Sequence, residues 1–137
     1  MTLDDLRTSL VDAVEAAKTG APGGVPIIEY DNRILVDLQT QTLPFVDAKV
    51  RFMNGTQADL SNAPIHRIDG ALIICAVTKV GAGSSAALLI LDHFYKQLQR
   101  KQFGGARTYM SRLAPSYTFK GWEYFPAVIP FWADIIS

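Results

Sequence analysis

The chain has 137 residues, of which 49% are hydrophobic and 19% are charged. This length suits one globular domain, and the composition excludes an intrinsically disordered protein. Thirteen basic and thirteen acidic residues cancel, but they are unevenly placed: residues 1–47 have eight acids and three bases, whereas residues 93–122 have six bases and no acid.

The first 20 residues predict an amphipathic helix over about residues 2–19. Its apolar side chains recur every three or four positions, at Leu3, Leu6, Leu10, Val14 and Ala17. Thr2 can cap the first turn, the aspartates after it suit the positive end of the helix dipole, and Gly20 ends the helix. The same aspartates argue against a secretion signal, which begins with basic residues.

Four segments in the middle of the chain predict strands. Residues 27–30 and 34–38 are short apolar runs, and residues 45–52 alternate as in a strand with one buried face. Residues 68–80 have an apolar centre without alternation, which is typical of a strand covered on both faces. We expect Asn54-Gly55 to end the third segment. After it comes a wide hairpin loop, or a little more strand followed by a loop.

A second helix is predicted over about residues 84–102, after a glycine turn at residues 81–83. Ser84 or Ser85 can cap it, and the glycine pair at positions 104–105 ends it. Its expected core stripe is Leu88, Leu91, Tyr95 and Leu98, widened by Leu89 and Phe94.

The last third of the chain predicts further strands, at residues 117–124 and 127–131. Pro130 has no amide hydrogen, so its strand should lie at a sheet edge or contain a bulge. Helices segregated from runs of strands predict an α+β fold. We expect a mostly antiparallel sheet of about four to six strands packed with two main helices, in a single domain over residues 1–137.

The glycine turn matches part of a dinucleotide-binding fingerprint, because Gly81, Gly83 and Ala86 fit G-x-G-x-x-G/A between a strand and a helix. That chemistry also needs an acid about 20 residues later, and residues 93–122 have none. The lysine of a Walker-type phosphate loop is missing as well. The turn is therefore interpreted as a structural corner, and no cofactor is expected.

No residue set suits catalysis or a metal. Cys75 lies in an apolar run and is expected to be a buried hydrophobe. Neither His66 nor His93 belongs to a motif that pairs it with a nucleophile or a metal. We therefore expect a protein that is not an enzyme. The absence of 18 consecutive apolar residues predicts no membrane-spanning helix and no membrane partner.

Basic and aromatic residues interleave between residues 96 and 122. The bases Arg107, Arg112 and Lys120 alternate with five aromatics, namely Phe103, Tyr109, Tyr117, Phe119 and Trp122. Proteins that bind single-stranded nucleic acid combine phosphate neutralisation and base stacking in this way. A small nucleic-acid- or anion-binding module is therefore one functional alternative.

The order of these segments resembles the tail terminator (tail completion) proteins of long-tailed bacteriophages, a family with prophage copies in bacterial genomes. The segments that carry the resemblance are VPIIEYDN, FVDAKVRF, HRIDGALIICAV with its Arg67, Gly70 and Leu72, the glycine turn with its helix, and AVIPFW. The resemblance implies an α+β structural subunit without catalysis or cofactor, encoded by a prophage.

In such proteins the subunits form a ring, typically a hexamer, on the last ring of the tail tube. The ring stops tube polymerisation and provides the surface on which the head docks. The resemblance therefore implies three partners: further copies of the chain, the tail-tube protein and the head–tail connector protein. A ring lumen leaves room for phage DNA. The expected location is the virion tail, assembled in the bacterial host cytoplasm.

The split charge suggests where such a ring would join, because a ring needs two different surfaces that meet between copies. The candidate interface residues are Asp4, Asp5, Asp12 and Glu15 on the first helix, and Arg100, Arg107 and Arg112 in the basic segment.

Long polar loops often carry contacts. The candidate contact loop for the tube or the connector contains Asn54, Gly55, Gln57 and Asp59.

Overall fold

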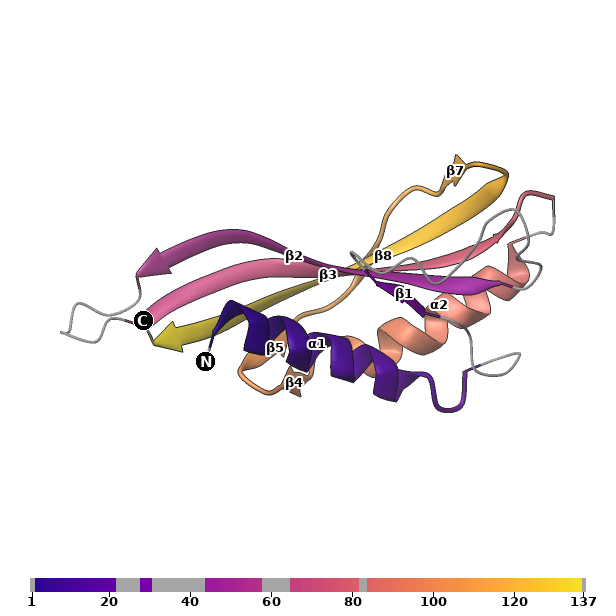
Figure 1. The fold of residues 1–137 in the computed structure, drawn as a ribbon. Coiled ribbons are helices and arrows are strands. Elements are labelled where there is room, and N and C mark those ends of the chain that lie inside the picture. Colours follow the sequence, from indigo (N-terminus) through magenta and orange to yellow (C-terminus); the bar gives the residue numbers. More distant parts are fainter. Residues whose placement is uncertain (1, 22–27, 31–43, 58–64, 82–83, 137) are drawn as a thin grey trace.

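The computed structural model describes residues 2–21, 28–30, 44–57, 65–81 and 84–136. Two helices and one sheet make an α+β fold, as predicted, and both helices lie on the same face of the sheet (Figure 1). The elements are α1 (Leu3–Ala17), β1 (Ile28–Tyr30), β2 (Phe45–Gln57), β3 (Ile65–Lys79), α2 (Ser85–Leu98), β4 (Gln102–Phe103), β5 (Ala106–Thr108), β6 (Arg112–Leu113), β7 (Tyr117–Phe119) and β8 (Trp122–Ile136).

The described sheet has eight strands in the order β1-β2-β3-β8-β5-β4, with β6 and β7 also paired to β8. All pairs are antiparallel except β1 with β2. The predicted four to six strands become eight because the segment between α2 and β8 forms four pieces of two or three residues. The expected strand at residues 34–38 lies outside the described residues.

The strand β2 continues beyond the turn that the sequence predicted. Asn54 and Gly55 do not end it, because β3 is long enough to pair with it as far as Gln57 opposite His66. The alternative of a little more strand is therefore the one observed. A register shift between Phe52 and Asn54 marks the position of the expected turn.

The longest C-terminal strand accommodates two prolines in mid-sheet. The backbone carbonyls of Pro126 and Pro130 accept hydrogen bonds from the amides of Ala114 and Tyr109, on the side of β8 away from β3. In an antiparallel strand the N–H and C=O groups of one residue point to the same side. The side on which each proline lacks an N–H group is therefore the side of the short strands β5 and β6. The prediction of a sheet edge or a bulge at Pro130 is therefore wrong, because β8 lies between β3 and β5 and pairs with β3 without a register shift. Lys120 and Gly121, both with positive φ, form the two-residue turn between β7 and β8.

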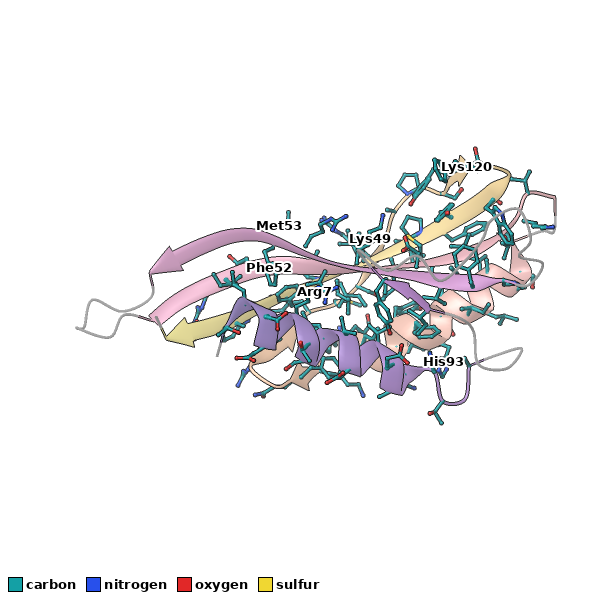
Figure 2. All side chains as sticks on the ribbon, viewed as in Figure 1. Arg7, Lys49, Phe52, Met53, His93 and Lys120 are labelled. Carbon is teal, nitrogen blue, oxygen red and sulfur yellow. The ribbon has the colours of Figure 1, made fainter. Side chains whose placement is uncertain are left out.

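The helix α1 begins as predicted. The Thr2 hydroxyl accepts a hydrogen bond from the Asp5 amide at 3.1 Å, and the Asp5 carboxylate accepts one from the Thr2 amide at 2.8 Å. This capping box satisfies two amides at the start of the helix. At the other end, the His93 ring nitrogen lies 2.7 Å from the Ala17 carbonyl oxygen, which ties α1 to α2 (Figure 2).

The stripe with which α2 packs matches the predicted one only in part, and Tyr95 is half-buried against the core. Leu91, Phe94 and Leu98 are buried as expected, but Leu88 and Leu89 are exposed. The buried set is Ala87, Ile90, Leu91, Phe94 and Leu98. Residues 86–91 are apolar on every side, so the spacing alone did not reveal which side meets the sheet. The helix also ends at Leu98 rather than near residue 102, because Gln99 is extended.

The glycine turn before α2 agrees only in part with the turn and helix cap that the sequence predicted. Gly81 has a φ of 91°, which a glycine adopts without strain. Ser84 is the N-cap residue, but its side chain forms no capping hydrogen bond. Gly83 lies outside the described residues, so the predicted glycine corner is confirmed at Gly81 alone.

Candidate interaction surface

The acidic residues predicted for the interface all lie on the exposed side of α1. Two of them have partners within the chain. Hydrogen bonds from Thr2 hold the pKa of Asp5 below its usual range. The Glu15 carboxylate lies 2.8 Å from the Lys18 ammonium and accepts a hydrogen bond from the Tyr30 hydroxyl at 2.6 Å. Among the described residues, no ion pair involves Asp4 or Asp12.

The predicted basic residues divide into two groups. Arg100 and Arg107 line one open groove of about 710 Å³, whereas Arg112 lies on β6, outside it. We call this groove the basic groove. Its lining residues are Arg100, Lys101, Gln102, Arg107, Thr108, Tyr109, Met110 and Trp132. No acidic residue is among them, so the surface is electropositive.

The hairpin that carries the groove is held by one buried hydroxyl. Thr108 is on the core side of β5, and its hydroxyl donates to the Leu98 carbonyl oxygen at 2.6 Å. The Thr108 hydroxyl oxygen in turn accepts a hydrogen bond from the Lys101 amide at 2.9 Å. These bonds join the end of α2 to β5. They fix the sharp turn at Arg100, whose φ is 54°.

On the opposite side of the sheet from the helices, Trp132 forms the apolar wall of the groove. It is directly opposite Arg107 in the pairing of β5 with β8. The guanidinium carbon of Arg67 lies 4.3 Å from the Trp132 ring centroid, and that of Arg107 lies 5.7 Å away. Such contacts are favourable because the ring face is electron-rich.

Arg67 is itself anchored by a bidentate ion pair with Asp134, with distances of 2.9 and 3.1 Å. This pair lowers the pKa of the Asp134 carboxyl and raises that of Arg67. Sequence reasoning missed both Arg67 and Trp132 as members of the surface. The alternation of residues 131–134 was the available signal, because it places Trp132 and Asp134 on one face of the strand.

The groove combines cations with exposed apolar groups. Tyr109 and Met110 are exposed, and Met110 is 60% accessible. The Arg100 guanidinium donates to the Met110 sulfur at 3.4 Å, which leaves most of its donors available. Guanidinium and ammonium groups bind carboxylates and phosphates, and the aromatic rings suit apolar or flat ligands. The arrangement therefore fits an anion that has an apolar part.

Replacing Thr108 with valine should destabilise the protein by about 1–3 kcal/mol, because the buried Leu98 carbonyl and the Lys101 amide lose their partner while the volume is kept. Urea denaturation measures the free energy of unfolding, and hydrogen exchange should show faster opening of residues 99–109. The exposed Thr118 on β7 provides the control, since its change to valine removes no buried bond. Equal losses for the two variants would contradict the role of Thr108.

A second exposed surface lies at the opposite edge of the sheet, on β2. In the described residues β1 pairs only with Val46, Asp47 and Ala48, so the rest of β2 has no second partner strand. Met53, 67% exposed, stands on the side of the sheet away from α1, while Phe52 meets Phe131 on the helix side (Figure 2). Three residues of the predicted contact loop, Asn54, Gly55 and Gln57, belong to this strand, and Asp59 lies outside the described residues.

The described residues contain no cluster of His, Cys, Asp and Glu that could hold a metal ion. Burial raises the pKa of the Cys75 thiol to about 11, so this cysteine stays protonated and is a poor nucleophile. Over the same residues, no helix is both long and apolar enough to cross a membrane.

Comparison with known proteins gives a fold and no family. No protein-family model matches the chain, and no curated protein matches it. A solved chain that is 14% identical in sequence superposes with a TM-score of 0.70 over 100% of this chain and 99% of its own length. At this identity the likeness shows that the two proteins share one fold over their whole length.

Proposed function

We propose that this protein is a tail terminator of a long-tailed bacteriophage, encoded by a prophage. Its copies form a ring on the end of the tail tube, stop tube polymerisation and provide the surface on which the head connector docks. The proposal starts from the resemblance in the order of the sequence segments. Assembly would take place in the bacterial host cytoplasm.

The observation that supports a ring best is the difference between the two sheet edges. One edge is the part of β2 with exposed Phe52 and Met53, and the other carries Tyr109, Met110 and the basic groove. A heterologous contact joins two different surfaces, and repeated contacts of this kind close into rings. Exposed apolar groups at both edges suit contacts between copies.

The proposed function is tested by polymerisation of the tail-tube protein encoded beside this gene. Added in amounts that match the number of tube ends, the protein should stop growth, and electron microscopy should show short tubes with an extra ring at one end. A control with a destabilised sheet is the variant Gly70→Ala, whose folded fraction is measured first by circular dichroism. Tubes that grow to the same length with and without the intact protein would refute the proposal.

A second candidate function is a nucleic-acid- or anion-binding module that uses residues 96–122. The observation that favours it is the basic groove, where Arg100, Lys101 and Arg107 lie close to Tyr109 and Trp132. Phosphates would bind the cations and bases would stack on the rings. In that case retention on single-stranded DNA should fall steeply with salt, because binding releases counterions.

A further inference from the structure

The first turn of α1 displays an apolar side chain beside a carboxylate. Leu3 is 49% exposed, whereas Leu6, Leu10, Val14 and Ala17 of the same helix are buried. Asp5 is occupied by the capping box, whereas Asp4 is exposed and belongs to no ion pair among the described residues. The turn at residues 3–5 therefore presents an apolar group and a negative charge together.

The basic groove has the complementary properties. Its cations Arg100, Lys101 and Arg107 form no ion pair with an acid of the described residues. Met110 and Trp132 supply apolar surface next to these cations. A short segment with one apolar and one acidic side chain would satisfy both features at once.

The first turn cannot enter the groove of its own chain. Leu6 and Leu10, one and two turns further along α1, pack against Phe131 and Ala133 on the helix side of the sheet. Trp132 and Arg107 lie on the other side, since alternate residues of a strand point to opposite faces. The sheet separates the two surfaces, so a contact between them requires a second copy.

We propose that the first turn of α1 from one copy docks into the basic groove of the next copy. The Asp4 carboxylate lies among the three cations, and Leu3 packs against Met110 and Trp132. This contact rests on the proposed function, because it supplies one of the contacts between neighbouring subunits of the ring. It is heterologous, so every copy uses its turn once and its groove once.

Charge balance favours a second copy over nucleic acid as the occupant of the groove. The chain has as many acids as bases, and its acidic excess is concentrated in the segment that includes α1. A protein whose main partner is a polyanion usually has a basic net charge. Here the complementary charge is on the same chain.

The test is a charge swap between Asp4 and Arg107. Asp4→Lys and Arg107→Glu should each weaken self-association at least about tenfold, because each brings like charges together in the contact. The double variant Asp4→Lys/Arg107→Glu should recover most of the loss. Sedimentation velocity over a concentration series in low salt measures the association constant. Circular dichroism verifies that each variant is folded.

Two control variants change the charge of the chain outside the contact, by one unit and by two units. Ala16→Lys adds a positive charge to the exposed side of α1, several turns from Leu3. Lys120→Glu reverses a charge in the β7–β8 turn, outside the groove. Both should associate as the native chain does. A chain that stays monomeric at every concentration, or single variants that associate normally, would overturn the proposal.

The same variants distinguish the contact between copies from nucleic-acid binding, and they test the contact separately from the proposed function. A fluorescent oligothymidine that binds the native chain, loses binding in Arg107→Glu and keeps it in Asp4→Lys would identify nucleic acid as the occupant and overturn the contact. If the swap restores association and the assembled protein fails to stop tube growth, the contact stands and the proposed function falls. If tube growth stops equally with all variants, the function stands and the contact falls.

Discussion

Replacing Gly70 with alanine should destabilise the protein by about 3 kcal/mol or more, which is at the upper end for an overpacked site. A Cβ atom on this residue would lie 2.2 Å from the Arg51 carbonyl oxygen and 2.6 Å from a ring carbon of Phe131. The strand β3 is paired on both sides here, to Phe52 on β2 and to Phe131 on β8, so the backbone has no free direction to move. The free energy of unfolding in urea provides the measurement.

A double variant shows which of the two collisions dominates. Shortening the ring with Phe131→Leu removes the side-chain collision and leaves the backbone oxygen of Arg51 in place. Gly70→Ala should therefore still destabilise the protein in the Phe131→Leu background, by a smaller amount. Native stability for Gly70→Ala alone would show that the strands move apart at this point. The site also affects the β2 edge, because the Phe52 and Phe131 rings meet across Gly70 at 6.1 Å between centroids.

The helical and central parts of the fold were predictable because their signals are local. The spacing of Leu6, Leu10 and Val14 predicts one buried helix face, and all three are fully buried. The alternation after Phe45 predicts β2 up to the bulge, and the apolar run before Val80 predicts β3. Each pattern arises from burial of one segment against the sheet, so a short window of sequence contains it.

The C-terminal region was harder to predict because its structure depends on pairing between distant residues. Pro130 argued against a central strand, and the interrupted partners β5 and β6 make β8 compatible with both of its prolines. The groove depends on the same pairings. Charge alone pointed to Arg100 and Arg107, whereas Arg67 joins Trp132 and Asp134 across 67 positions of sequence. A pattern within a short window of sequence cannot reveal a contact between residues this far apart in the chain.

The apolar sequence of α2 leaves open which side of this helix packs against the sheet, and a measurement can answer that question directly. Residues 86–91 are Ala-Ala-Leu-Leu-Ile-Leu, so a stripe through Leu88 and a stripe through Ile90 fit the sequence equally. The structure uses the stripe that continues through Phe94, because this ring belongs to the same buried core cluster as Leu72 and Ile129 of the sheet. The Leu88 side is then left exposed next to Leu89, as an apolar area available to a partner.

Phe94→Ala should therefore lower the free energy of unfolding by about 3–5 kcal/mol, a large share of the 5–15 kcal/mol typical of a domain. The ring is fully buried, so its removal leaves a cavity between α2 and the sheet. Leu88→Ala on the same helix is the matched control. Its side chain is 46% exposed, and its loss should cost less than about 1 kcal/mol. Urea denaturation of both variants decides the matter: a larger loss for Leu88 than for Phe94 would mean that α2 packs through the stripe which the sequence first suggested.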